Sequence, residues 1–208
     1  MVSSGEPIHA DLDGGWILPA PAARVPVHTR SILCRSFRRD DGLLEIDGRF
    51  IDTRPFEYDS EFRGICTAGA ALHHMQLRLT VDSTRHIHAL VSAMHATPYA
   101  GCADVNPNFQ RLVGVSLGRG FRKTLREKVG GSEGCTHIIA LLDVMAAAAV
   151  QTFTSAGYAA LKPGQPKPAR IFRMEQLVDT CYSYRSGSPV LQQIQARSAQ
   201  AERGRQNG

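Results

Sequence analysis

Hydrophobic and polar residues alternate with a period of two through much of the first half of the chain. In "LLEIDGRF", Leu44, Ile46 and Phe50 share one face of a predicted strand. The segment "MQLRLTVD" at 75–82 alternates more clearly, and after the turn "DSTR" the segment "HIHALVSAMHA" returns as its partner. Two such segments joined by a short polar turn predict an antiparallel hairpin.

The period becomes helical after Pro98. The segments "NPNFQRLVG" and "RGFRKTLREKVGG" each predict a helix, and two glycines end the second. A longer alanine-rich helix is expected from about residue 136 to 160, and "RMEQLVDTCYSYR" predicts a last helical segment after a proline-rich connection. Strands followed by helices predict an α+β fold. In it, an antiparallel sheet from the N-terminal half packs against a C-terminal group of helices.

The chain of 208 residues is the right size for one domain with short additional segments. Residues 1–24 are rich in glycine, proline and alanine and predict a flexible N-terminal arm. Residues 25–186 contain all the predicted strands and helices and therefore form a single α+β domain. Residues 187–208 are polar and predict a disordered tail.

Composition and charge restrict the environment and the partners. The first residues lack a basic leader followed by an apolar segment, and the apolar run 138–150 is interrupted by Asp143 and too short to cross a bilayer. We therefore expect a cytoplasmic protein that does not bind membranes. The net charge of +5 comes from scattered arginines without a basic stripe, so no nucleic-acid partner is expected. A small-molecule substrate is expected. The sequence does not decide whether the protein forms a homo-oligomer.

Two polar residues fall on the apolar faces of predicted strands. His73 has the parity of the buried face of its strand, and Asp52 continues the apolar face of the strand before it. A buried imidazole that stays neutral suits a metal ligand or a general base, but also a core histidine bonded to a backbone carbonyl. Asp52 either pairs with an arginine such as Arg30 or Arg54, or is part of a site.

Five cysteines in a reducing compartment are expected to be free thiols, metal ligands or catalysts rather than disulfides. Cys102 lies in a predicted loop, Cys135 at a predicted helix start with His137 two residues on, and Cys181 near the last helical segment. Three sulfurs and one imidazole nitrogen are a suitable ligand set for zinc. However, the chain has no C-x-x-C pair, so only the fold can bring these four residues together.

Alternatively, Cys135 could be a thiolate nucleophile, because a helix N-terminus lowers the pKa of a thiol. Its neighbour His137 is a poor base for it, since residues two apart on a helix point roughly 200° from each other, unless Cys135 precedes the regular helix. His73 would then be the better base. In a third interpretation these residues are small apolar side chains that only pack.

Seven stretches, taken in order, resemble one known family. They are "HTRSI", "RRDDGLLEIDGRFIDTRPF", "HHMQLRLTVD", "PYAGC", "GRGF", "GGSEGCTHIIALL" and "DTCYSYR". Over about residues 26–187 they are similar to the bacterial family catalogued as domain of unknown function 2889. The resemblance implies no mechanism. It does place His73, Cys102, Cys135, His137 and Cys181 on motif positions, with His74 where the family has an acidic residue.

Taken together, the sequence predicts a metal-binding protein, with zinc as the metal, that acts as an enzyme on a small organic molecule. Cys102, Cys135, Cys181 and His137 would hold the ion, and His73 and Asp52 would act as acid and base. Alternatively, His73 would replace Cys181 as a ligand, which gives a mixed site better suited to catalysis. If it is an enzyme, a metal-assisted hydrolase or lyase is expected. The alternatives are a non-catalytic structural or partner-binding protein stabilised by the Cys/His cluster, and a metal-free cysteine-dependent acyl-transfer enzyme.

Overall fold

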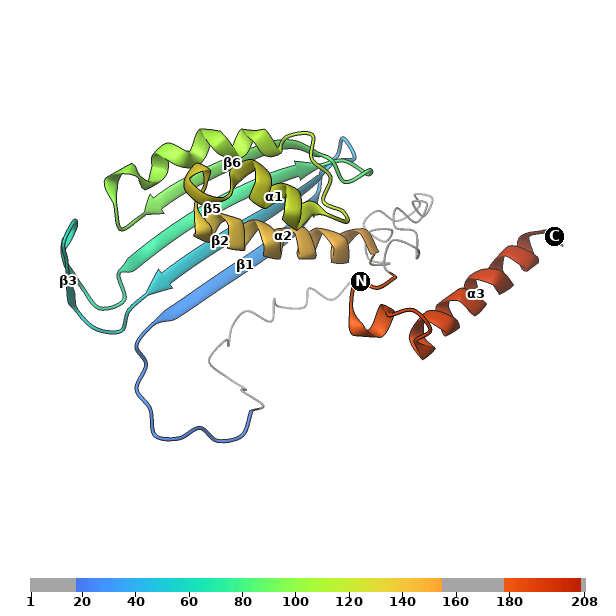
Figure 1. Ribbon diagram of the computed structural model, residues 1–208, viewed down its shortest axis with the longest axis horizontal. Coiled ribbons are helices and arrows are strands. Elements are labelled where there is room, and N and C mark those ends of the chain that lie inside the picture. Colours follow the sequence, from blue (N-terminus) through green and yellow to red (C-terminus); the bar gives the residue numbers. More distant parts are fainter. Residues whose placement is uncertain (1–17, 155–177, 207–208) are drawn as a thin grey trace.

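A computed structural model describes residues 18–154 and 178–206 of the chain (Figure 1). Four long strands form one antiparallel sheet in the order β1-β2-β5-β6. The strands are β1 (Thr29–Arg38), β2 (Leu44–Thr53), β5 (Ala71–Val81) and β6 (Ile87–Ala96). Between β2 and β5 the chain makes a small two-stranded ribbon of β3 (Tyr58–Ser60) and β4 (Gly64–Cys66). The hairpin predicted from "MQLRLTVD" and "HIHALVSAMHA" is the β5–β6 pair.

Helices cover one face of this sheet (Figure 1). They follow β6 in the order η1 (Ala100–Leu112), α1 (Phe121–Val129), η2 (Gly131–Glu133) and α2 (Thr136–Thr154), where η denotes a 3₁₀ helix. The predicted α+β class, with an antiparallel sheet in the N-terminal half and helices after it, is therefore confirmed. A further 3₁₀ turn η5 (Tyr182–Tyr184) and the helix α3 (Pro189–Gln206) complete the described chain.

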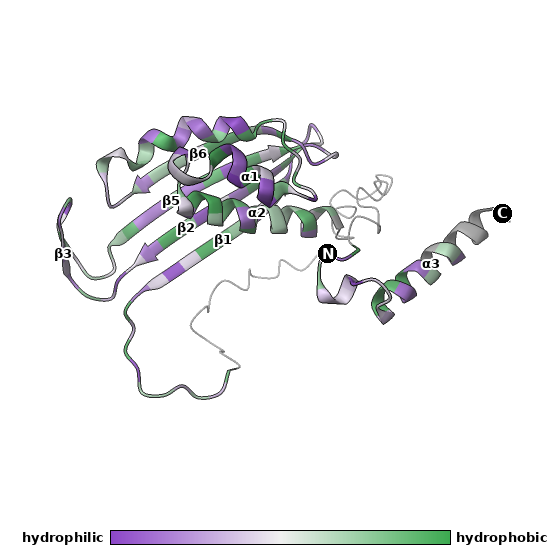
Figure 2. Ribbon diagram, in the orientation of Figure 1, coloured by the Kyte–Doolittle hydropathy of each residue, from purple (hydrophilic) through white to green (hydrophobic). Residues whose placement is uncertain are grey.

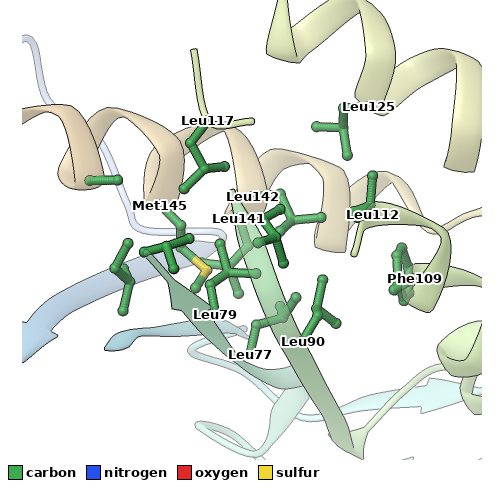
Figure 3. Packing of buried hydrophobic residues seen from close by; sticks show 14 of the residues in the cluster. Leu77, Leu79, Leu90, Phe109, Leu112, Leu117, Leu125, Leu141, Leu142 and Met145 are labelled. Carbon is green, nitrogen blue, oxygen red and sulfur yellow. The ribbon is translucent and has the colours of Figure 1, made fainter. Parts of the chain in front are cut away.

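The core lies between the sheet and α2. Leu44, Ile46 and Phe50 of β2 are at most 1% exposed, as their alternation predicts. Leu77 and Leu79 of β5 meet Leu141, Leu142 and Met145 of α2 in the same cluster (Figure 3). The strands show alternating hydrophobic and hydrophilic bands in Figure 2, because every second side chain points away from the helices.

A glycine sets the close approach of α2 to the sheet. Gly48 lies on the inner face of β2, and a Cβ atom at this position would meet the side chains of Met145 and Leu141. The absence of a side chain there lets α2 pack directly on the strand.

Helix α2 is longer than the apolar run 138–150, which we expected to be too short to cross a membrane. Its 19 residues are long and apolar enough to cross a membrane by length and composition alone, so the length argument was wrong. In this structure α2 is a core helix, with Ile138, Leu141, Leu142 and Met145 fully buried against the sheet. The expectation of no membrane partner stays a prediction.

The structure can be compared with the predicted N-terminal arm and C-terminal tail only in part. Residues 1–17 lie outside the described residues, and 18–28 run in irregular backbone with exposed side chains. Helix α3 occupies most of the segment for which the polar sequence predicts a disordered tail. Most of the predicted helical segment "RMEQLVDTCYSYR" falls outside the described residues, and its last part forms turns and η5. The division at 25 and 186 stays a prediction.

Candidate metal centre

Three polar side chains form one row across the sheet at the end of β2. Arg30 of β1 is the ladder partner of Asp52, and Asp52 is the ladder partner of His73 on β5. The Arg30 guanidinium donates two hydrogen bonds to Asp52, from Nε to Oδ1 at 2.8 Å and from the terminal nitrogen to Oδ2 at 2.9 Å. His73 Nδ1 lies 3.0 Å from Oδ2. The inward direction expected for Asp52 and His73 from strand parity is thus what the structure has.

The register of the sheet shifts directly beside this row. Asp52 faces His73, whereas the next residue, Thr53, faces Ala71, so Leu72 is the extra residue of a bulge. Bulges re-aim side chains and are common next to functional sites. Here the bulge ends the regular pairing of β2 and β5 immediately after the two polar residues that face the helices.

His137 approaches the row from the first turn of α2. Its ring centroid lies 3.9 Å from that of His73, with the two planes inclined by 35°. The edge of the Phe50 ring packs against His137 at 5.3 Å between centroids. One ligand atom from each of Asp52, His73 and His137 can be chosen so that all three lie within 4.8 Å of one another. Asp52 and His73 are buried and His137 is half-buried.

A glycine-rich turn sets the position of His137. The segment "GGSEG" separates α1 from α2 and contains the short helix η2. Gly131 has a φ of +59°, which favours glycine. At Gly134, a Cβ atom would clash with the backbone carbonyl oxygen of Val129. Both glycines therefore have a structural role, which is to let the chain turn tightly into the start of α2.

Two basic side chains flank the buried carboxylate. Arg30 lies with its guanidinium carbon 4.6 Å from the centre of the Phe50 ring, and its side chain is 44% exposed. His28 Nε2 lies 3.3 Å from Asp52 Oδ1, with a side chain 40% exposed. Both residues have inward strand parity in "HTRSILC". This parity is the signal by which the sequence could have identified His28 as a neighbour of Asp52. The sequence analysis named Arg30 only as one of two partners and missed His28.

The surroundings hold Asp52 as a carboxylate. Burial by itself raises the pKa of this group, but the hydrogen bonds and the charge of Arg30 outweigh it. The hydrogen bond from His73 and the charge of His28 act in the same direction, so the pKa of Asp52 lies below its ordinary value. Because a carboxylate only accepts hydrogen bonds, His73 Nδ1 donates to it, and Nε2 of the neutral ring keeps a free lone pair.

The two imidazoles are held in the neutral form. Burial lowers the pKa of His73 and outweighs the hydrogen bond and the negative charge of Asp52, which raise it. Burial also lowers the pKa of His137, and the neighbouring His73 and the charge of Arg30 lower it further, against the opposing charge of Asp52. One carboxylate and two neutral imidazoles are the protonation states in which these groups bind a metal ion.

The cysteines of the predicted zinc set are only partly near this group. Cys135 Sγ lies 3.7 Å from His137 Nδ1. Because α2 begins at Thr136, Cys135 precedes the regular helix, which is the exception that brings residues two apart together. Cys102 is half-buried in η1, and Cys181 is exposed beside η5. Neither belongs to the group of three within 4.8 Å found among the described residues.

The structure thus regroups the residues named from the sequence. His137, named as a metal ligand, joins His73, named as acid or base and as an alternative ligand, and Asp52, named as acid or base. The four residues Cys102, Cys135, His137 and Cys181 are not gathered at one point in the described chain. The reason is geometric, because the loop before α2 directs His137 towards β2 and β5, whereas Cys102 and Cys181 lie in η1 and beside η5.

Comparison with known proteins agrees with the resemblance in the motifs. The family model described as "Protein of unknown function (DUF2889)" matches residues 28–151, which is more than half of the chain. The match begins at His28 and includes Arg30, Asp52, His73 and His137, whereas Cys181 lies outside it. No curated protein and no solved structure matches the chain. The chain belongs to the DUF2889 family.

Proposed function

We propose that Asp52, His73 and His137 hold a zinc ion, and that the protein is a cytoplasmic, metal-dependent enzyme for a small organic molecule. The observation that carries the proposal is the convergence of one carboxylate and two imidazoles within 4.8 Å. They come from β2, β5 and α2, which are far apart in sequence. Such a convergence needs the whole fold, and a core that required only packing would have apolar residues here.

The ligand set favours a catalytic site over a purely structural one. Structural zinc sites are closed by four protein ligands, whereas catalytic sites use three and leave a position for water or substrate. Two histidines and one carboxylate also suit non-haem iron(II). The metal content of purified protein distinguishes zinc from iron at such a site.

The hydrogen bonds that Arg30 donates to Asp52 are compatible with a metal-bound carboxylate. A carboxylate offers about four lone-pair positions, of which the two hydrogen bonds from Arg30 and the one from His73 occupy three, which leaves one for a metal ion. Ligating carboxylates are commonly held by such outer hydrogen bonds, which fix their orientation. Zinc in this position would activate water or polarise a carbonyl group, so the reaction class that we propose is that of a hydrolase or lyase.

The exposure of the residues around Asp52 indicates from which side a small substrate would enter. Arg30 and His28 are both partly exposed while the carboxylate that they contact is 1% exposed. A ligand would therefore reach the buried group past these two side chains. No nucleic-acid or membrane partner is part of this proposal.

Metal analysis with matched histidine variants tests the proposal. We expect one zinc ion per chain in purified protein, and loss of the ion in His73→Ala and His137→Ala. His95→Ala is the control, because His95 lies on β6 and is exposed. Adding zinc to chelator-treated wild type should raise the melting temperature. At a free zinc concentration one hundred times the dissociation constant, zinc should stabilise the fold by about 2.7 kcal/mol. A wild type that neither contains zinc nor is stabilised by it contradicts the proposal.

The contact between Cys135 and His137 supports two alternatives. If Cys135 completes a closed four-ligand site, the metal is structural, and Cys135→Ser will lose it. If the protein is a metal-free thiol enzyme, Cys135 will be alkylated rapidly and stoichiometrically in chelated protein, well ahead of the half-buried Cys34. For the catalytic zinc site, Cys135→Ser keeps the metal and Cys135 shows no such reactivity.

A further inference from the structure

The face of the sheet that points away from the helices contains a hollow of about 560 Å³. Its first row of side chains runs across all four strands, since Leu33, Arg49, Gln76 and Ala93 are successive ladder partners. These residues have the parity opposite to that of the core. They are therefore separated from the candidate metal centre by the thickness of the sheet.

A second row lies next to the first and is more strongly charged. Arg35, Asp47, Arg78 and Val91 are again successive ladder partners on β1, β2, β5 and β6. In both rows the outer strand β6 contributes an apolar residue and the two middle strands contribute polar ones. The hollow thus has a charged floor and apolar sides.

The apolar sides are unusually exposed. On β1, Phe37 borders the hollow and is 46% exposed, and on β6, Val91 is 63% exposed. An ordinary solvated face of an antiparallel sheet carries polar residues at such positions. An apolar flank on each side of charged residues is instead typical of a ligand site, in which apolar walls surround a few polar groups.

The charges on the floor are not balanced. Arg78 donates two hydrogen bonds of 2.7 Å to Asp47, which satisfies that pair. The guanidinium groups of Arg35 and Arg49 make no hydrogen bond or ion pair with any residue that the structure describes. Three guanidinium groups and one carboxylate line the hollow, so two positive charges are in excess. The excess attracts an anion, and it opposes the docking of a second copy of this face.

We propose that this hollow binds a small organic anion with an apolar body, of the alkyl carboxylate class. The carboxylate would lie between Arg35 and Arg49, whose planar guanidinium groups match its geometry. The alkyl chain would lie against Phe37 on one side or Val91 on the other. The volume is within the range of small-molecule sites, which is about 300–1,000 Å³. The site is distinct from the metal centre and does not depend on it.

Calorimetric titration of the intact protein with octanoate tests this assignment. We expect octanoate to bind with a dissociation constant of about 1 mM or tighter, which is modest for a ligand of its size. Acetate, which lacks the apolar body, and octanol, which lacks the charge, should each bind at least about tenfold more weakly. Equal binding of octanol and octanoate would show that the arginines play no part.

Arginine variants locate the binding. Arg49→Gln and Arg35→Gln should each weaken octanoate binding about tenfold or more, because each removes a charged partner of the carboxylate. Arg24→Gln is the matched control, since Arg24 is exposed and precedes β1, and its affinity should equal that of the wild type. Unchanged melting temperatures establish that the exposed substitutions keep the fold. Octanoate affinity that is the same in Arg49→Gln as in Arg24→Gln, or no binding to the wild type, overturns the proposal.

Discussion

At the scale of the residue, Asp52 is the most constrained group of the site. Its side chain is 1% exposed, yet it is an anion, so its stability in the core depends on the donors around it. Arg30 provides two of them, and His73 and His28 approach the same two oxygens. Removal of one partner therefore leaves a buried charge without compensation, which costs far more than removal of an ion pair at the surface.

Replacing Arg30 measures this dependence. Arg30→Gln should lower the free energy of unfolding of the metal-free protein by about 2 kcal/mol, below the range for fully buried pairs because Arg30 is partly exposed. Urea denaturation monitored by circular dichroism gives the value. Arg78→Gln is the control, since Arg78 bonds Asp47 with equal geometry but both groups are substantially exposed, and it should cost about 0.5 kcal/mol. Equal losses in the two variants would contradict the argument.

Strand parity predicted the direction of these side chains but not which residues they contact. Alternation in "EIDGRFID" and "HHMQLRL" is enough to turn Asp52 and His73 towards the core. It does not tell which strand pairs with which at that row, nor which helix lies above it. His137 was therefore assigned to three cysteines, of which only Cys135 is near it in sequence, although the structure places it on His73.

At the scale of the element, the turn before α2 determines where the helix begins. Two glycines allow it, Gly131 through a positive φ and Gly134 through a position in which a side chain would overlap a backbone carbonyl. The overlap at Gly134 is with backbone rather than with a flexible side chain, so it cannot be relieved by a change of rotamer. The helix start, and with it His137, must shift if a side chain is added.

Gly134→Ala should therefore affect both stability and the candidate site. We expect a loss of about 2–3 kcal/mol in the free energy of unfolding, and weaker zinc binding in the fraction that folds. Gly101→Ala is the matched control, because a Cβ atom there makes only an ordinary contact with Asp104, and it should change stability by about 0.5 kcal/mol or less. Chemical denaturation and metal titration of both variants provide the comparison. A Gly134→Ala protein as stable as Gly101→Ala would refute the role assigned to the turn.

The cysteines illustrate what spacing can and cannot predict. A tight C-x-x-C pair specifies a metal knuckle from local sequence, and this chain has none. The remaining spacing between Cys102, Cys135 and Cys181 carries no geometric information until the elements are placed. Cys135 was correctly located at the start of a helix, whereas its 3.7 Å approach to His137 follows from backbone that is not yet helical.

At the scale of the whole molecule, one core accounts for the sheet and its covering helices. All described members of the buried cluster lie between Leu44 and Phe153, and among the described side chains after residue 177 only Tyr184 packs against it, partly buried. The family match ends at residue 151, close to the end of this cluster. Among the described residues, the sheet and the helices up to α2 therefore contain nearly all members of the buried apolar cluster.

A fragment of residues 18–154 should fold without the remainder of the chain. We expect a single cooperative urea transition and a loss of about 1 kcal/mol relative to the full chain, mainly from the contacts of Tyr184. The fragment retains Asp52, His73 and His137 and should bind zinc as the full chain does. Denaturation and metal titration of the two proteins side by side test this. A fragment that stays unfolded would show that the segment after 154 contributes to the core.

The fold class followed from the order of periodicities, strands first and helices afterwards. It was predictable because each element is long enough to express its period, as in β5 and α2. The pairing of β1 with β2, the bulge at Asp52 and the excursion through β3 and β4 were not predictable. Each depends on contacts between segments whose sequences carry no mutual signal.

The two faces of β2 carry residues of the two proposed sites. Arg49 points into the hollow and its neighbour Phe50 packs on His137, and a similar alternation on β5 separates Gln76 from Met75. If octanoate on one face changes the zinc affinity on the other by some factor, zinc must change the octanoate affinity by the same factor. Titrating either ligand in the presence of the other therefore measures one coupling free energy twice, by independent routes.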